Sequence, residues 1–351
     1  MVPESLAHFF GIGLTQIELA SGLLVVVLAW LAWMWWTIGR DRWYGDVSYL
    51  TGNTTQRIKP PFARETVVVE YTPPGIGEKK RPIRPAEMGL LINERANTLD
   101  TTATIIDLVA RGYLRIRQPS WQKEAKEKGY ELVMVRGPDE HMLGYERTLM
   151  YGLFGQSKSI LFNELPYHAE VRLAHEALYD QVVERDHFFS GTPPQVRRSY
   201  QVYACALLLT GLSAILILGA LADFGLLGVP LVLAALAMLP VASVMPRRTA
   251  LGREFYRRCL GFRQFMVSQK ERQGFLEEEG VFEKYLPYAI VLGCAGRWAE
   301  TFADIGVYTG KIEHYVGEIG VLRALTSSLA PFVDYPMTPE PAVGCSRGNG
   351  S

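Results

Sequence analysis

The sequence has few cysteines, and their spacing does not fit a metal site. Among the 351 residues, the cysteines are Cys205, Cys259, Cys294 and Cys345. Structural zinc sites usually have ligands about two to four residues apart, and no two of these cysteines are that close. A phosphate-binding loop is also lacking, because Gly75-Ile76-Gly77 has no third glycine and no Walker motif occurs. The sequence therefore predicts neither a metal nor a cofactor.

The chain also has no net charge. Its 36 basic and 36 acidic residues give a formal net charge of zero at pH 7. Proteins that bind nucleic acids through their phosphates usually carry an excess of Lys and Arg. The charge balance therefore argues against nucleic acid as a partner.

Charged residues are missing from three long apolar runs. These runs are residues 19–38, 202–220 and 226–244, and none contains Asp, Glu, Lys or Arg. Each is close to the roughly 20 apolar residues that cross a hydrocarbon core. The first run has no basic segment before it, which a signal peptide would need. We therefore expect one uncleaved transmembrane anchor followed by a hairpin of two transmembrane helices.

Basic residues flank each run at only one end. The flanking pairs are Arg40 and Arg42, Arg197 and Arg198, and Arg247 and Arg248. Since basic residues stay on the cytoplasmic side of a membrane, this pattern predicts a multi-pass protein with residues 1–18 outside. The large polar regions and the C-terminus are then cytoplasmic, where disulfides are rare.

The polar regions predict an α+β membrane protein with two cytoplasmic domains. Residues 39–65 read as a linker and residues 331–351 as a disordered tail. The segment 66–196 has the element order of a winged-helix domain followed by a long helix. Its expected elements are a strand at 66–71, helices at 85–93 and 101–111 with Asp100 as N-cap, strands at 113–117 and 130–136, and helices at 144–154 and 167–188.

A helical C-terminal domain is expected at residues 246–330, against the inner leaflet. Its helices are predicted at residues 251–269 and 285–303. The apolar core of the second helix is too short to span a membrane. The domain begins with a basic stretch of six candidate lipid-headgroup ligands: Arg247, Arg248, Arg253, Arg257, Arg258 and Arg263. Each would contribute roughly 1 kcal/mol to binding at an anionic membrane surface. The alternative is that these residues only set the orientation of the spans in the membrane.

Other polar side chains point to structure rather than chemistry. His168 and His175 lie seven residues apart, about two helical turns, so we expect solvated helix residues rather than ligands of one zinc ion. Asp107 and Arg111 are spaced for an intrahelical ion pair. Cys294 lies in an apolar run and is expected to be a core residue. No catalytic residue can be assigned from these patterns.

Several motifs resemble the YciQ-like family of predicted bacterial membrane proteins, a domain of unknown function. They are residues 73–75, 85–89, 102–116, 145–146, 261–262 and 282–293, with Trp298 and Phe302. The resemblance covers about residues 46–305 and implies the bacterial inner membrane but no reaction. Family members usually carry an outer β-rich domain ahead of the first span, where this sequence has about 18 residues. The motif residues of unknown role are Asp107, Arg111, Gly112, Tyr113, Leu286, Pro287, Tyr288 and Trp298.

The leading hypothesis is a non-enzymatic cytoplasmic scaffold or protein-interaction module anchored in the membrane. Its partners would be the lipid bilayer and other proteins, including a second copy of itself. One alternative is a component of a membrane enzyme or transport system, with a site between the cytoplasmic domains near Tyr288, Trp298 and Glu300. Another is a membrane-tethered DNA-binding regulator, although the helix at 101–111 offers few base-reading side chains.

Overall fold

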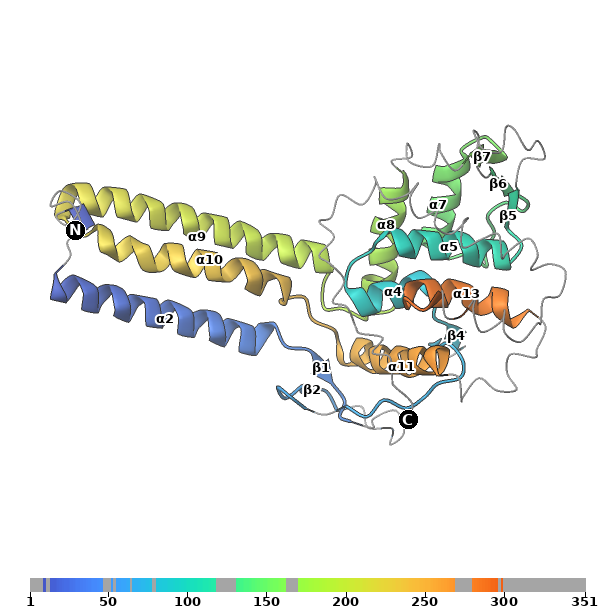
Figure 1. Cartoon of the computed structure of the whole chain (residues 1–351), viewed down its shortest axis with the longest axis horizontal. Helices are drawn as coiled ribbons and strands as arrows, with labels where there is room; N and C mark the ends of the chain where they lie inside the picture. The colour runs from blue at the N-terminus through green and yellow to red at the C-terminus, as the bar shows by residue number, and fades with distance from the viewer. Residues whose placement is uncertain are drawn as a thin grey trace, which may run out of the picture. The chain divides into compact units, whose positions relative to one another are not determined.

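The structure is a computed structural model of the chain. It describes residues 9–10, 13–46, 52, 55–63, 65–77, 80–117, 131–161, 170–268, 280–295 and 298. The chain divides into two compact units, each formed from two separated segments (Figure 1). Unit 1 combines Met1–Ala96 with Ala177–Phe275, and unit 2 combines Asn97–Glu176 with Leu276–Ser351.

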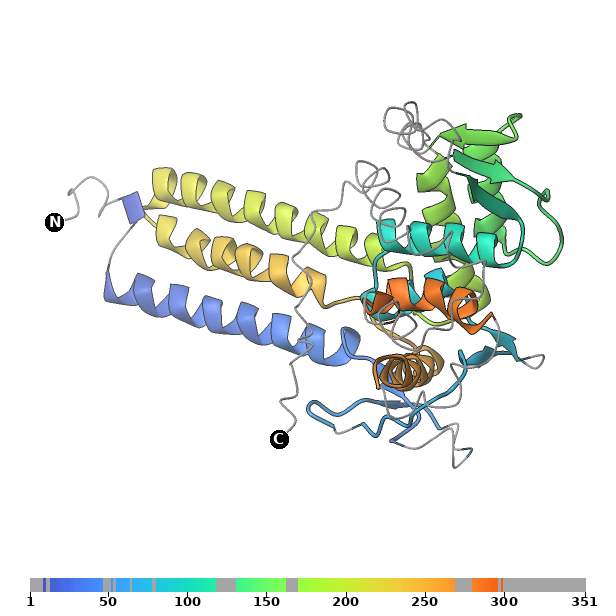
Figure 2. The same cartoon turned by 45° about the vertical axis from the view of Figure 1, so that its right-hand side comes forward.

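Three helical segments of unit 1 are long and apolar enough to cross a membrane. They are Leu14–Ile38, Pro193–Ala222 and Gly225–Ser243. The first is α2, the second is α9, and the third consists of the 3-10 turn η3 (Gly225–Gly228) followed by α10 (Val229–Ser243). The helices lie side by side in both views (Figure 2). The three apolar helices predicted from the sequence are thereby confirmed, with α2 and α9 starting earlier than expected.

Apolar and small side chains hold these helices together. A buried cluster joins Leu31 and Met34 of α2, Ala204 of α9, and Ala234 and Met238 of α10, with Met245 just beyond. Close packing of small residues is a common basis of helix association in membranes, because lipid supplies no hydrophobic driving force between helices.

The closest approach within the hairpin involves two glycines. A Cβ atom on Gly228 would lie 2.6 Å from the carbonyl oxygen of Gly211, and one on Gly211 would lie 2.9 Å from the backbone nitrogen of Val232. Both distances are shorter than van der Waals contact. The backbones of α9 and of the η3–α10 segment can therefore meet only because these positions lack side chains.

Replacing Gly228 by Leu should accordingly destabilise the hairpin. We expect a loss of about 1–3 kcal/mol, because the added side chain forces the two backbones apart. Gly22→Leu on α2 is the matched control, since a Cβ atom there has no neighbour within 4 Å. Thermal unfolding in detergent, followed by circular dichroism, measures both variants. Equal melting temperatures for the two would contradict the close crossing.

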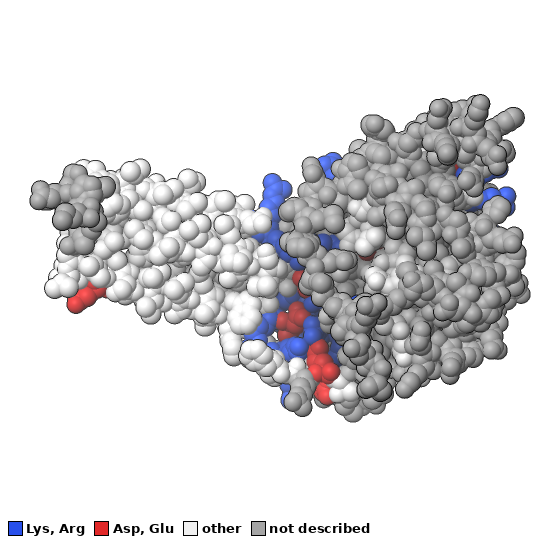
Figure 3. All heavy atoms as spheres, in the orientation of Figure 1, with Lys and Arg blue, Asp and Glu red and all other residues white. Residues whose placement is uncertain are grey.

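One end of the membrane helices is formed by α2 and the hairpin turn. The start of α2 contacts η3, and Phe9 lies within 3 Å of where side chains on Gly219 and Gly225 would begin. The arginines that flank the spans lie at the opposite end. Figure 3 shows a largely uncharged surface along the helices, with blue and red side chains gathered at that opposite end. This one-sided distribution agrees with the charge pattern in the sequence.

The rest of unit 1 is built around two helices, α4 (Pro85–Asn93) and α11 (Ala250–Val267), which pack on each other. Two short antiparallel hairpins accompany them. Strand β1 (Arg42–Trp43) pairs with β2 (Arg57–Ile58), and β3 (Gly75–Ile76) pairs with β4 (Arg81–Pro82). Helix α8 (Glu170–Asp180) begins in unit 2, and its last four residues belong to unit 1, where it continues into the π-helical turn η2 (Gln181–Arg185), which contacts α4. The long helix predicted to reach residue 188 thus ends earlier.

The prediction of a strand at residues 66–71 is wrong. Among the described residues the segment pairs with no strand, and it contacts α11 instead. A Cβ atom on Gly261 would lie 1.9 Å from the carbonyl oxygen of Val68, so the segment contacts the helix backbone directly. Tyr71 packs edge-on against Phe265, with 5.4 Å between ring centroids. A β-branched run can thus pack against a helix as well as within a sheet.

Within the described residues, unit 2 contains a three-stranded antiparallel sheet, three whole helices and the first part of α8. The strands are β5 (Leu114–Arg117), β6 (Glu131–Met134) and β7 (Ser159–Leu161), in the order β5-β6-β7. The helices are α5 (Thr98–Ala110), α7 (Gly144–Phe154) and α13 (Val281–Val291), and α5 packs against both α13 and β5. The strand β7 was not predicted. A winged-helix arrangement of these elements stays a prediction.

Helix α5 starts one turn before the predicted N-cap. Asn97 is the N-cap, and its side-chain oxygen accepts a hydrogen bond from the backbone nitrogen of Asp100 at 3.1 Å. Asp100 in turn accepts from the backbone nitrogen of Asn97 at 2.8 Å, which completes a reciprocal capping box. Asn and Asp are about equally good N-caps, so residue type alone did not favour Asn97 over the predicted Asp100.

Several polar residues of α5 are buried. Thr101, Thr102, Thr104 and Asp107 are all at most 6% exposed. The hydroxyl groups of Thr102 and Thr104 donate to backbone carbonyls one turn earlier, at 2.9 and 2.7 Å. These intrahelical bonds let short polar side chains enter a core without losing their hydrogen bonds.

Candidate functional site

The C-terminus of α4 receives a buried arginine from the end of the third membrane helix. Arg248 is 7% exposed, and its guanidinium donates to the carbonyl oxygens of Leu91 at 3.0 and 3.1 Å and of Ile92 at 3.1 Å. It also pairs with Glu94, 2.7 Å away. The last carbonyls of a helix lack intrahelical donors and carry partial negative charge. Arg248 therefore acts as a charged cap for α4.

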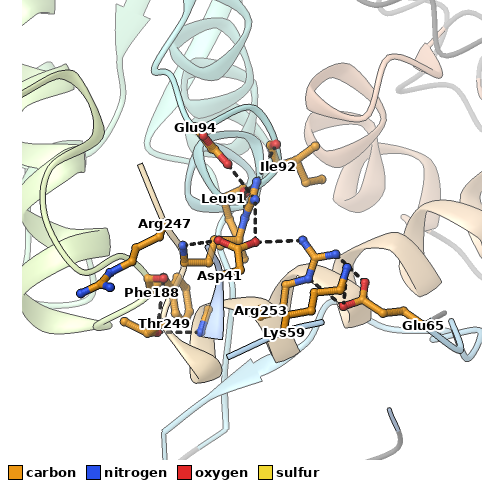
Figure 4. A network of polar contacts seen from close by, with 12 residues as sticks. Asp41, Lys59, Glu65, Leu91, Ile92, Glu94, Phe188, Arg247, Thr249 and Arg253 are labelled. Atoms are coloured by element: carbon orange, nitrogen blue, oxygen red, sulfur yellow. Dashed lines mark hydrogen bonds and ion pairs between the residues drawn. The ribbon is translucent and has the colours of Figure 1, made fainter. Parts of the chain in front are cut away.

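The other two membrane helices reach the same place. Arg197, near the start of α9, donates to the main-chain oxygen of Glu94 at 3.0 Å and to its carboxylate at 3.1 Å. Asp41, three residues after α2 ends, accepts from the backbone nitrogen of Arg248 at 2.7 Å. Asp41 occupies the centre of the network in Figure 4, with Arg253 and Glu65 on one side. We call Asp41, Glu94, Arg197 and Arg248 the α4 anchor.

Most of the arginines proposed as lipid-headgroup ligands are paired within unit 1. Arg253 binds Glu65 and Asp41, Arg257 binds Asp46, and Arg258 binds Glu70. Arg247 donates to the hydroxyl of Ser190 at 2.9 Å and to the carbonyl oxygen of Ile38, the last residue of α2, at 3.2 Å. Arg263 is partly buried on α11. Lipid contact by these six residues stays a prediction, but Arg248, Arg253, Arg257 and Arg258 already have carboxylate partners.

A second buried cluster lies at the start of α4. The carboxylate of Glu87, 0% exposed, accepts two hydrogen bonds from Arg81, at 2.8 and 3.0 Å, and one from the backbone nitrogen of Arg84 at 2.7 Å. Arg81 also reaches Asp186 at 3.4 Å, and Asp186 accepts from the side chain of Gln181. We call Glu87, Arg81, Asp186 and Gln181 the Glu87 cluster.

Burial dominates the ionisation of this cluster. It raises the pKa of Glu87 to about 7, and the nearby charge of Asp186 acts in the same direction, whereas Arg81 acts against them. Glu87 is therefore partly protonated near neutral pH. The pKa of the neighbouring Cys259 thiol is also raised by burial, so this thiol stays protonated and unreactive. Sequence reasoning missed Glu87, although its position two residues after Pro85 marks a helix start.

The motif residues at the end of α5 form a structural junction in unit 2. Arg111 pairs with Asp107 at 2.9 Å, which confirms the predicted intrahelical pair, and with Glu146 of α7 at 2.6 Å. Gly112 has a φ of +79° and ends the helix, and the backbone nitrogen of Tyr113 bonds to Leu108 in a Schellman motif. The junction thus fixes the turn from α5 into β5 and ties it to α7.

Tyr113 extends this junction to the loop before α7. Its hydroxyl donates to the carboxylate of Asp139 at 2.7 Å, and its ring lies beneath the guanidinium groups of Arg111 and Arg136. Burial and the Asp139 carboxylate raise the pKa of Tyr113, so the phenol stays protonated. The role of this side chain is to hold two cations and one carboxylate in place.

Residues 80–302, more than half of the chain, match the family described as predicted membrane protein (DUF2207), C-terminal domain. The chain belongs to this family. The matched region contains the Glu87 cluster, the unit 2 junction and three of the four residues of the α4 anchor, whereas Asp41 lies before it. No curated protein and no solved structure matches the chain.

The motif residues of α13 are core residues of unit 2. Leu286 and Tyr288 are 3% and 5% exposed, and Trp298 is fully buried. Pro287 is buried within the helix. The Trp298 indole donates to the carbonyl oxygen of Phe282 at 3.4 Å, and its ring packs edge-on against Tyr285. Cys294 is buried too, as expected, whereas Glu300 lies outside the described residues.

His175 is partly buried and hydrogen-bonded, not fully solvated, which corrects the sequence-based expectation. Its Nε2 atom lies 2.7 Å from the hydroxyl oxygen of Thr101, and burial lowers the pKa of the imidazole to about 4. The neutral ring therefore serves as a hydrogen-bond partner of α5. His168 lies outside the described residues. Among those described, no three His, Cys, Asp or Glu side chains are grouped to hold a metal ion.

Proposed function

We propose that this protein is a scaffold of the bacterial inner membrane that holds protein partners at the cytoplasmic face. Within its family, the motifs at residues 102–116 and 282–293 favour the YciQ-like type. Unit 2, with its helix and strand order, would act as a winged-helix-like interaction module. The flanking arginines favour an orientation with the N-terminus outside.

The observation that carries this proposal is the α4 anchor. Residues next to the ends of α2, α9 and α10 all bind at the C-terminus of α4 or to the arginine that caps it. A polar region linked to its spans only by flexible loops would pivot freely. Charge-assisted hydrogen bonds of this kind stabilise by about 1.5–3 kcal/mol each, so the anchor mounts α4 rigidly on the membrane helices. A fixed mounting suits a platform that binds partners in a defined orientation.

The buried polar face of α5 weighs against the DNA-binding alternative. Base readout requires an exposed helix with side chains such as Arg, Asn or Gln that reach the groove. Thr101, Thr102 and Thr104 are buried and bond within unit 2. We therefore favour proteins over nucleic acid as partners.

Crosslinking of the full-length protein in native membranes tests the proposal. We expect recovery of a reproducible protein partner, which includes a second copy of the chain. Arg197→Gln should reduce that recovery, because it removes a donor to Glu94. Arg198→Gln is the matched control, since the neighbouring Arg198 is exposed. No partner with the unmodified protein would contradict the scaffold, and equal recovery from both variants would contradict the role of the anchor.

A further inference from the structure

A tight turn after β2 presents a fully exposed aromatic side chain. The backbone nitrogen of Ala63 bonds to the carbonyl oxygen of Pro60 at 3.3 Å, which closes a four-residue turn with Pro61 and Phe62 at its centre. Phe62 is 101% exposed and has a φ of +61°. A proline followed by a residue with positive φ is typical of a type II turn, in which the second position usually holds Gly or Asn.

In water, both properties of Phe62 are unfavourable. A left-handed backbone conformation is unfavourable for a residue with a side chain, because the Cβ atom crowds the backbone. A phenyl ring in contact with water also forgoes the favourable free energy of burying its apolar surface. An apolar environment around the ring would offset both costs.

The register of the β1–β2 hairpin places this turn close to the end of a membrane helix. The backbone nitrogen of Lys59 donates to the carbonyl oxygen of Asp41 at 3.0 Å, and the Arg40 guanidinium donates to the carbonyl oxygen of Lys59. Asp41 is three residues beyond Ile38, where α2 ends. Three residues span at most about 10 Å, so Lys59 lies near the level at which α2 leaves the membrane.

An aromatic residue marks that level on α2 itself. The Arg40 guanidinium lies 4.2 Å from the centroid of the Trp36 ring, and Trp36 is 50% exposed. Tryptophan is enriched where the hydrocarbon core meets the headgroups, and a cation beside it fits the headgroup layer. Both Arg40 and its backbone partner Lys59 are therefore next to the bilayer interface.

The exposed surface around the turn has the chemistry of an interfacial segment. Ile58 is 49% exposed, and Pro60 and Pro61 are exposed beside Phe62. Arg57 is also exposed, so the apolar tip has a cation next to it. Segments that lie in the interface combine apolar side chains that enter the acyl boundary with basic ones that stay among anionic headgroups.

We propose that residues 58–62 form an interfacial membrane contact, with Phe62 inserted at the boundary between headgroups and acyl chains. The occupant of this apolar surface is the lipid bilayer, because the turn is tied by backbone hydrogen bonds to residues just past a membrane span. The contact involves residues of neither the three spans nor the α4 anchor, although its backbone is bonded to that of Asp41, and it does not depend on the scaffold function.

Fluorescence quenching in liposomes of phosphatidylethanolamine and phosphatidylglycerol tests the insertion. Full-length protein carrying Phe62→Cys is labelled with an environment-sensitive fluorophore, in a background with Cys205→Ser and Cys345→Ser. The buried Cys259 and Cys294 are retained, and the background protein serves as the labelling blank. Pro61→Cys provides a second position in the turn that does not require a positive φ. Gln56→Cys is the matched control, because Gln56 is exposed beyond the opposite end of β2.

We expect blue-shifted emission at positions 61 and 62, with strong quenching by lipids that carry a nitroxide near the headgroup end of the acyl chain. The fluorophore at position 56 should instead be quenched by aqueous iodide. Iodide quenching of all three positions would overturn the proposal. Equal lipid quenching at 56 and 62 would also overturn it, because the contact would then not be specific to the turn.

Discussion

Replacing Arg248 by Gln should destabilise the protein by about 3–5 kcal/mol, which is the usual cost of removing one partner from a buried ion pair. The variant leaves Glu94, Asp41 and the last carbonyls of α4 without the guanidinium that they share, although the backbone nitrogen at position 248 can still donate to Asp41. Glutamine is too short and too weak a donor to replace a guanidinium with bonds on three sides. Thermal unfolding in detergent, followed by circular dichroism, gives the change in stability.

Two further variants separate the charge pair from general disruption. Arg198→Gln removes an exposed arginine from α9 and should change stability by less than about 1 kcal/mol. The double variant Glu94→Gln, Arg248→Gln should lose less unfolding free energy than the sum of the two single variants. In each single variant one charge of the pair loses its partner, whereas the double variant removes both charges. An Arg248→Gln variant as stable as the Arg198→Gln control would show that the α4 anchor is not a structural link.

Replacing Glu87 by Gln should remove a large part of the pH dependence of stability. The pKa of Glu87 rises from 4.5 to about 7 on folding, because the carboxylate is buried. The folded state therefore favours the protonated form. The contribution of Glu87 to the free energy of unfolding is fully present below pH 4.5, and it is lost as the pH rises through about 7. A shift of this size corresponds to about 3 kcal/mol across that window.

Unfolding free energies measured across this pH range provide the test. In the unmodified protein, the Glu87 contribution lowers stability as the pH rises, and Glu87→Gln should flatten that slope. Asp186→Asn should shift the pH range in which this stability is lost to lower pH, because the Asp186 charge raises the pKa of Glu87. Glu176→Gln is the control, since this side chain is 63% exposed. A Glu87→Gln variant with an unchanged slope would mean that the carboxyl ionises as it does in water.

Together, these two predictions assign both ends of α4 a defined physical role. The start of the helix holds a protonatable carboxyl group without contact with solvent, and its end is fixed to the membrane helices by arginine. A change in the protonation of Glu87 acts on the same helix that carries the anchor. Both sets of variants can therefore be compared in one crosslinking experiment.

Local patterns in the sequence were enough to predict much of the secondary structure. Helix α4 begins at Pro85, as expected, and Gly112 terminates α5 by adopting a positive φ. The three apolar runs form helices that are long and apolar enough to cross a membrane, as their length and lack of charged residues predicted. These signals are local, since they depend on residues within a turn or on a continuous run.

Predictions failed where the outcome depended on a distant partner. The segment at residues 66–71 has strand-forming residues, yet it packs on α11 because Gly261 allows a direct backbone approach. The short strand β7 forms because β6 offers it a free edge. Thr101 is buried because His175 supplies a hydrogen-bond partner 74 residues away. Periodicity within one segment contains no information about such partners.

The sequence by itself determined that the chain has three apolar helices and that the arginines flanking these helices lie at one end of them. Only the tertiary structure decided where those arginines point. Arg248 bonds to Leu91, 157 residues earlier, so no local pattern could reveal that its charge is used to cap a helix. The physical reason is that a buried cation must find its compensating carbonyls and carboxylates, and only the folded chain brings these groups within bonding distance.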